Sequence, residues 1–294
     1  MSRLTATKSD CRAARGTEVC ATRRAVLKGC AAATVAFALP AVHASDWQQI
    51  RQRGSLVVAL YQEMPPFHDK GRGIDVDLGR ALATEMGLGF SALPFAAGEN
   101  MGDDLRNMVW KGHYLGWGPA DVLLHVPVDP PLMRESPQVQ IVAPYYRERV
   151  MLAVDKQKLP SVESVFDLAG KPVAVAGLSL AGWLMLGAEG GLLRPNLVTR
   201  LPDGVAAARA LKQGDVVAAA GLASELESVL AGDERFTLQP LPTPRAPRDG
   251  WAVGCAVKKD ATELAAGLQQ AMQALQANGQ LTALFRTHGV SRQL

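Results

Sequence analysis

The chain has 294 residues, of which 48% are hydrophobic and 20% charged, and its formal net charge is +3. The positive excess belongs to the first 44 residues, where seven Lys and Arg face two Asp and Glu; the rest of the chain carries 24 basic and 26 acidic residues, a net charge of −2. This balance, with no run of five Lys or Arg anywhere, argues against a nucleic-acid partner. After residue 44, no run of 18 apolar residues predicts a membrane-spanning helix.

The first 44 residues have the pattern of an export signal. A pair of arginines within residues 22–28 precedes an uncharged, Ala-rich run over 29–42, and the small residue Ala44 follows. The first of these segments resembles the twin-arginine consensus, with Val26 in place of its Phe. We therefore expect residues 1–44 to be a twin-arginine signal peptide that is cleaved after Ala44 and directs the protein to the periplasm.

Removal of the expected leader would leave a single cysteine in an oxidising compartment. Three of the four cysteines lie in the expected leader, so Cys255 is left alone and has no partner for an internal disulfide. It falls within an apolar run over 251–257, and we interpret it as a buried, inert thiol.

From residue 55 onward, short apolar runs alternate with segments of helical spacing. In chain order, strand, helix, strand, helix and strand are predicted over 55–60, 74–86, 89–95, 101–109 and 122–126. Asp75 and Asp77 open the first of these helices, where carboxylates suit the helix dipole, and we interpret both as solvated. This βαβαβ order predicts a parallel sheet with crossover helices.

The same rhythm restarts after residue 160, so two α/β lobes are expected. Helices are predicted over 162–168, 179–188 and 203–212, and strands over 172–176, 197–201 and 216–220. The Pro-rich and Arg-rich stretch 240–249 reads as a surface connection. A returning strand over 251–257 and two helices over 262–277 and 280–288 complete the chain.

Seven short motifs, each weak alone, stand in a specific order and spacing. They are Leu56-Val57-Val58-Ala59 with Pro65-Pro66-Phe67, Gly73 to Leu78, Ala120-Asp121-Val122, Pro144-Tyr145-Tyr146, Asp167 to Val175, Ala210 to Asp215, and Ala252 to Lys258. Through them the chain after the leader resembles the extracellular solute-binding proteins of family 3 over nearly its whole length.

The resemblance implies a two-lobe periplasmic binding protein fold of type II. Each lobe would be a mainly parallel sheet flanked by helices, and the chain would cross the hinge between the lobes twice. By analogy, residues 45–149 plus 252–294 form lobe 1 and residues 150–251 form lobe 2. Such proteins close on a small polar solute and present it to an ABC permease, because groups from both lobes contact the ligand only in the closed state.

The groups that hold an α-amino acid in this family are altered here. The arginine nearest to the expected carboxylate-binding position, Arg134, is about one position out of register and lacks the accompanying Thr. In lobe 2 the family's Gly-Thr-Thr becomes Leu178-Ser179-Leu180. The acid that would receive the ammonium group maps near Ala220 and Gly221, where no charge stands. The resemblance therefore implies the fold but not the usual ligand.

Candidate ligand-binding residues come from the ends of predicted strands and the starts of helices, because ligands of open α/β sheets bind beyond the carboxyl ends of the strands. For His125 a structural role is the alternative, and for Ser179 a helix N-cap. For Tyr61, Glu63 and Phe67 it is packing at a lobe edge and solvent, and for Trp183 a partner contact or packing over the lobe edge. The expected set is Tyr61, Glu63, Phe67, His125, Arg134, Ser179 and Trp183.

The stretch 112–121 is longer than its counterpart in the family, and it contributes Tyr114 and Trp117. These aromatic side chains predict a position lining the cleft, a protein contact, or packing over the lobe edge. The stretch and its flanking residues are similar to the branch of the family found with quinoprotein alcohol dehydrogenases. An accessory protein of a PQQ-dependent dehydrogenase is therefore the alternative function, with Tyr114 and Trp117 facing the partner.

A third class of function rests on residues 177–181, Gly-Leu-Ser-Leu-Ala, which resemble a nucleophile elbow. A secreted serine hydrolase would need Ser179 as nucleophile and His288 as base, with one of Asp203, Asp215, Asp233, Asp249 or Asp260 as orienter. The histidines His68, His113, His125 and His288 show no metal-ligand spacing, so neither a metal nor another cofactor is expected. We expect a monomeric periplasmic binding protein without catalytic activity.

Overall fold

The computed structural model describes residues 46–292. The expected signal peptide and its cleavage site lie outside the described residues. Within 46–292, no helix combines the length and the apolar character that a membrane crossing requires.

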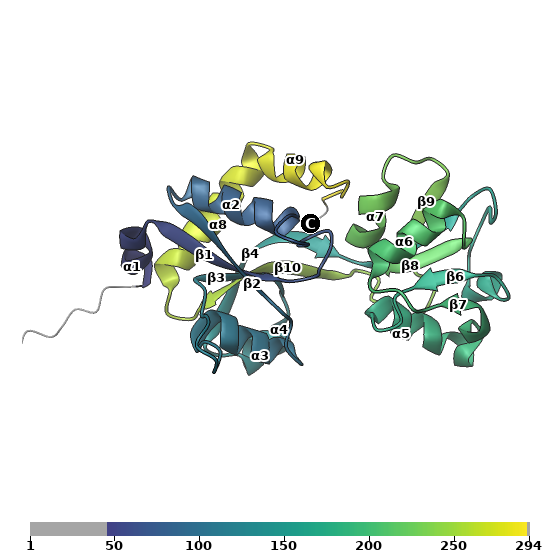
Figure 1. Ribbon diagram of the computed structural model, residues 1–294, viewed down its shortest axis with the longest axis horizontal. Coiled ribbons are helices and arrows are strands. Elements are labelled where there is room, and N and C mark those ends of the chain that lie inside the picture. The colour runs from purple at the N-terminus through teal and green to yellow at the C-terminus, as the bar shows by residue number, and fades with distance from the viewer. Residues whose placement is uncertain (1–45, 293–294) are drawn as a thin grey trace, which may run out of the picture. The chain divides into compact units, whose positions relative to one another are not determined.

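The first sheet has five strands in the order β2-β1-β3-β10-β4 (Figure 1). Strands β2, β1 and β3 are parallel to one another, whereas β10 is antiparallel to both β3 and β4. Four strands therefore run in one direction and β10 opposes them. The bounds are β1 Ser55–Tyr61, β2 Gly89–Phe95, β3 Val122–Pro127, β4 Val139–Glu148 and β10 Trp251–Lys258.

The second sheet repeats this arrangement in the order β7-β6-β8-β5-β9. Strands β7, β6 and β8 are parallel, and β5 is antiparallel to both β8 and β9. Both sheets are thus mixed, with a single opposing strand, and the expected two-lobe α/β architecture is confirmed. The bounds are β5 Val150–Asp155, β6 Val173–Val175, β7 Leu197–Val198, β8 Ala218–Leu222 and β9 Phe236–Pro240.

Helices cover both faces of each sheet, and each sheet with its helices is called a lobe below. In the first lobe, α2, α8 and α9 lie on one face and α3 and α4 on the other (Figure 1). Its helices are α1 Asp46–Arg53, α2 Ile74–Glu85, α3 Met101–Leu105, the π-helix η1 Arg106–Trp110, α4 Pro130–Glu135, α8 Thr262–Ala277 and α9 Gln280–Thr287.

In the second lobe, α5 lies on one face of the sheet and α6 and α7 on the other (Figure 1). Each face buries its own hydrophobic cluster, with Leu184 and Met185 of α5 in one and Leu211 of α6 with Leu226 of α7 in the other. The helical elements are the 3-10 turns η2 Val165–Leu168, η3 Ala188–Gly191 and η4 Arg194–Asn196, and the α-helices α5 Leu180–Gly187, α6 Gly204–Gln213 and α7 Ala223–Leu230.

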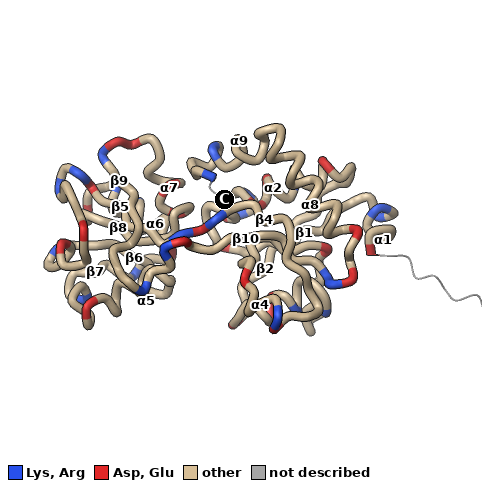
Figure 2. The backbone as a smooth tube through the Cα atoms, turned by 180° about the vertical axis from the view of Figure 1, so that it is seen from behind, with Lys and Arg blue, Asp and Glu red and all other residues tan. Residues whose placement is uncertain are grey.

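The chain passes between the two sheets at two places. Arg149 alone separates β4 from β5, and residues 241–250 connect β9 to β10. The crossings lie side by side: a Cβ on Gly250, whose φ is +61°, would stand 1.9 Å from the carbonyl oxygen of Glu148, so this position requires glycine. Figure 2 shows basic and acidic residues where the chain passes between the two sheets. The proposed boundary between residues 149 and 150 lies at the first crossing, whereas the proposed boundary between residues 251 and 252 lies one residue inside β10.

The helix predicted over 101–109 changes character after one turn. α3 ends at Leu105, and the chain continues as the π-helix η1, in which Lys111 donates its N–H to the carbonyl of Arg106. The widened turn leaves the carbonyl of Met108 to accept the N–H of Ala120 at 2.8 Å, which anchors the end of the 112–121 stretch.

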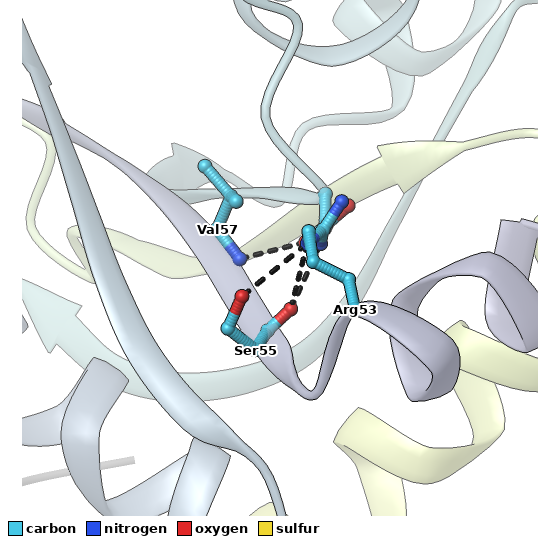
Figure 3. A network of polar contacts seen from close by, with 4 residues as sticks. Arg53, Ser55 and Val57 are labelled. Atoms are coloured by element: carbon cyan, nitrogen blue, oxygen red, sulfur yellow. Dashed lines mark hydrogen bonds and ion pairs between the residues drawn. The ribbon is translucent and has the colours of Figure 1, made fainter.

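Asp121, part of a motif that carried the family resemblance, has a structural role. Its carboxylate accepts the Val57 N–H of β1 at 2.6 Å and pairs with Arg53, which also donates to the carbonyl of Ser55 (Figure 3). Burial raises the pKa of Asp121, against the lowering effect of the Val57 N–H and of Arg53. This network joins α1, β1 and the entry to β3.

Candidate functional site

A cavity of about 210 Å³ is lined by residues from both lobes. The first lobe contributes the turn after β1 and one position in β3, while the second contributes the starts of α5, α6 and α7. These are the strand ends and helix starts at which α/β folds bind ligands. The lining residues are Glu63, Met64, Pro65, Phe67 and His125 from the first lobe, and Leu178, Ser179, Pro202, Asp203, Leu222, Ser224 and Glu225 from the second.

His125 is held by a buried polar network behind the cavity wall. Its backbone, at φ +63°, donates its N–H to the hydroxyl of Tyr145 at 2.9 Å, and that hydroxyl donates to Asp75 Oδ1 at 2.8 Å. The other oxygen of Asp75 lies 3.5 Å from Nδ1 of His125. The ring of Phe67 packs edge-on against the imidazole at 4.1 Å. The ring is thus fixed on two sides.

The interpretation of Asp75 as a solvated helix-start residue is wrong. The residue is only 2% exposed, and its carboxylate accepts from Tyr145, whose pKa is raised by burial and by the Asp75 charge. Asp77 is the exposed member of the pair, and one of its oxygens lies 2.8 Å from Nε2 of His288. The two residues are two positions apart, slightly more than half a helical turn, so Asp75 faces the core and Asp77 faces solvent.

Ser179 is the N-cap of α5. Its hydroxyl donates to the carbonyl of Ala176 at 2.8 Å and accepts the N–H of Gly182 at 3.1 Å. His288, the base that a hydrolase would need, pairs with Asp77 of its own lobe. Ser179 and His288 therefore each have a structural partner of their own. The helix-cap interpretation accounts for Ser179.

Two acids outside the predicted ligand-binding set line the cavity. Asp203 caps α6 by accepting the N–H of Ala206 at 2.7 Å. Glu225 accepts the N–H groups of Gly204 at 2.9 Å and Leu222 at 2.8 Å. A Cβ at Gly204 would stand 2.2 Å from the Glu225 carboxylate, so glycine permits this approach.

Burial raises the pKa of Glu225 to about 7, partly opposed by the two N–H donors from the backbone. The charge of Glu148 raises it further. The expectation that this part of the cleft lacks charge, drawn from Ala220 and Gly221, is thus corrected: the acids reach it from α6 and α7.

Glu148 lies directly behind Ser224, a cavity-lining residue. Its carboxylate is fully buried and accepts the Ser224 hydroxyl at Oε2 and the N–H groups of Ser224 and Arg149 at Oε1. Burial raises the pKa of Glu148 and these donors lower it. Glu148 ends β4 and Ser224 lies in α7, so the contact joins the two lobes.

The other predicted ligand residues do not line this cavity. Tyr61 is buried, and its hydroxyl donates to Asp104 at 3.0 Å, while burial raises the pKa of the phenol. Arg134 lies exposed on α4. Trp183 is 64% exposed on α5. Of the predicted set, the cavity brings together Glu63, Phe67, His125 and Ser179.

The predicted partner-facing residues differ in exposure. Tyr114 is 88% exposed and neighbours the exposed Leu115, whereas Trp117 stacks on His113 with a centroid distance of 4.0 Å. The N–H of His113 donates to the carbonyl of Trp117 at 2.8 Å, which closes the loop into a tight turn. The turn presents Tyr114 outward.

Within residues 46–292, no group of three His, Cys, Asp or Glu side chains is arranged to hold a metal ion. Cys255 is fully buried in β10, as predicted, and burial raises the pKa of its thiol.

No protein-family model matches the sequence. No curated protein matches it either. Solved structures do match. An ancestral cationic amino acid solute-binding protein is 20% identical with a TM-score of 0.62, covering 82% of this chain and 98% of its own. An amino acid ABC transporter substrate-binding protein from Streptococcus pneumoniae, bound to L-arginine, is 26% identical with a TM-score of 0.51, covering 82% and 96%.

A further match shows that the fold also occurs in the lineage of an enzyme. It is an ancestral amino acid-binding protein described as a precursor of cyclohexadienyl dehydratase, 20% identical with a TM-score of 0.55, covering 84% of this chain and 100% of its own. Most of the similar structures are nevertheless binding proteins. The chain has the two-lobe fold of amino acid ABC transporter substrate-binding proteins, the solute-binding protein family 3 fold.

Proposed function

We propose that this protein captures a small solute in the cavity between its lobes and delivers it to an ABC permease. The observation that carries the proposal is the composition of the cavity wall, with five residues from the first lobe and seven from the second. A ligand that contacts both walls binds the closed arrangement best, so it shifts the hinge equilibrium toward closure.

The cavity chemistry supports selective binding of a small molecule. Apolar walls from Phe67, Leu178 and Leu222 alternate with a few polar groups, the usual composition of a small-molecule site. The polar groups are fixed by the protein before any ligand arrives, because His125 is held by the Tyr145 network and Glu225 by two backbone N–H groups. Such preorganisation lowers the cost of binding.

The compartment and partners belong to the same proposal. An export leader over residues 1–44 would place the protein in the periplasm, where a permease receives the solute. We propose that it acts as a monomer. We also propose that it is a binding protein rather than an enzyme, since the Ser179 hydroxyl is engaged in capping α5. A fluorophosphonate probe that labels Ser179 would contradict the binding role.

A second candidate, an accessory role for a PQQ-dependent quinoprotein dehydrogenase, is favoured by one observation. Tyr114 and Leu115 stand exposed at the tip of a loop that is held by internal hydrogen bonds. Exposed apolar side chains on a rigid turn suit a protein contact. Co-purification with a dehydrogenase, lost in a Tyr114→Ala and Leu115→Ala variant, would favour this role over uptake.

The capture proposal is tested by thermal unfolding of the exported protein in the presence of amines, amino acids and organic acids. A solute present at a hundred times its Kd raises the free energy of unfolding by about 2.7 kcal/mol, a clear shift in Tm. A His125→Ala variant should lose the shift, whereas His113→Ala, outside the cavity, should retain it. A solute that stabilises both variants equally, or no stabilising solute at all, would contradict capture at this site.

A further inference from the structure

The charges that line the cavity have one sign. Three carboxylates line it, those of Glu63, Asp203 and Glu225, and no Lys or Arg is among the lining residues. Among the described residues, none of the three forms an ion pair with a basic side chain within 4 Å. Apart from His125, the ionisable side chains of the wall are therefore all acidic.

The remaining titratable group of the wall does not reverse this sign. His125 lies 3.5 Å from Asp75, so a protonated imidazole would be matched by a buried carboxylate. Its Nδ1 is buried and makes no hydrogen bond within the described residues. Glu148, behind Ser224, adds a further negative charge that acts on Glu225.

A ligand carboxylate finds no matching group here. Arg134, the arginine closest in sequence to the expected carboxylate-binding position, lies exposed on α4 and does not line the cavity. At the start of α5 the Ser179 hydroxyl already accepts the Gly182 N–H. A carboxylate placed in the cavity would face the carboxyl groups of Glu63, Asp203 and Glu225 and no Lys or Arg, an unfavourable Coulomb interaction in a partly desolvated site.

We propose that the captured solute is a small organic cation that lacks a carboxylate, such as a primary amine or a guanidine. This inference rests on the proposed function and specifies its ligand. The cation would be held by Glu225 and Asp203 in the second lobe and by Glu63 in the first, so that binding draws carboxylates of both lobes to one charge. The cavity volume of about 210 Å³ limits the ligand to a short molecule.

Agmatine and L-arginine make a matched pair of probes, since the two differ only by the carboxylate. The exported protein is titrated calorimetrically with agmatine, putrescine, L-arginine and succinate. We expect agmatine or putrescine to bind at least tenfold more tightly than L-arginine, with no binding of succinate. L-arginine or succinate binding as tightly as the amines would overturn this inference while leaving capture intact.

Substitutions of the lining acids test whether the preference for a cation comes from this cavity wall. Asp203→Asn keeps an N-cap for α6, because Asn caps as well as Asp, and removes only the charge. Together with Glu225→Gln it should weaken amine binding at least tenfold, whereas Glu234→Gln, an exposed acid of the same lobe, should not change it. Amine binding that survives the double substitution, or binding of uncharged solutes alone, would overturn the inference. Absence of binding by any solute would remove the capture proposal as well.

Discussion

Glu148 and Ser224 form a buried contact between the lobes: the carboxylate of Glu148, at the end of β4, accepts both the hydroxyl and the backbone N–H of Ser224 in α7. Ser224 also lines the cavity, so the contact ties the ligand site to the crossing segment. Because the carboxylate is fully buried and forms no ion pair among the described residues, it depends on these donors.

Removing the hydroxyl should therefore cost stability. We expect Ser224→Ala to lower the free energy of unfolding by about 1–3 kcal/mol, the range for leaving one buried partner unsatisfied. Urea denaturation at pH 7 measures this change in the free energy of unfolding. Ser228→Ala is the matched control, because the Ser228 hydroxyl in the same helix donates to the carbonyl of Glu225 and no buried charge depends on it. Equal losses in the two variants would contradict a special role for the Glu148 contact.

The raised pKa of Glu225 predicts a pH dependence of stability. The folded state holds the proton up to about pH 7, whereas the unfolded chain releases it near the ordinary value of 4.5. In that window the folded state binds more protons, so the free energy of unfolding falls as pH rises. We expect wild type to lose stability relative to Glu225→Gln between pH 5 and pH 8, measured by urea denaturation without ligand. Glu234→Gln should show no such change relative to wild type, and a flat difference for Glu225→Gln would refute the prediction.

Much of the fold follows from apolar patterning alone. The predicted strand 89–95 and helix 262–277 agree with β2 and α8 residue for residue, because each combines a clear period with a turn residue at its boundary. β4 was not predicted. Its alternation of buried and half-buried residues is interrupted by Pro144, which argues against a central strand. β4 lies at the edge of the sheet, where a proline is tolerated.

The site was less accessible to sequence reasoning, because its residues meet only through tertiary structure. Strand ends identified Glu63, Phe67 and His125, since position along a strand is a local property. Glu225 gave no such signal: it lies in α7, which was not predicted, and its position depends on the space left by Gly204. Asp75 was misjudged because the sequence does not show that Tyr145, 70 residues away, supplies a buried hydrogen bond.

The Tyr145 hydroxyl is expected to be a stabilising group. Tyr145→Phe would leave the His125 N–H without its acceptor and Asp75 Oδ1 without its donor, both in a buried setting. We expect a loss of about 1–3 kcal/mol in the free energy of unfolding. Tyr114→Phe makes the same chemical change at a site 88% exposed and should have no measurable effect. Comparable stability of Tyr145→Phe and wild type would show that the network contributes little.

The network of Figure 3 predicts an asymmetry between the two members of one ion pair. Asp121→Ala removes the acceptor of the Val57 N–H as well as the partner of Arg53, so we expect a loss of about 1–3 kcal/mol. Arg53 is 43% exposed, and Arg53→Ala leaves the Asp121 contact to Val57 in place. This variant should therefore lower the free energy of unfolding by less than about 1 kcal/mol. Urea denaturation of both variants and of their double mutant measures the difference. If the pair itself carried the stability, the two single losses would be equal, and the double mutant would lose no more than either.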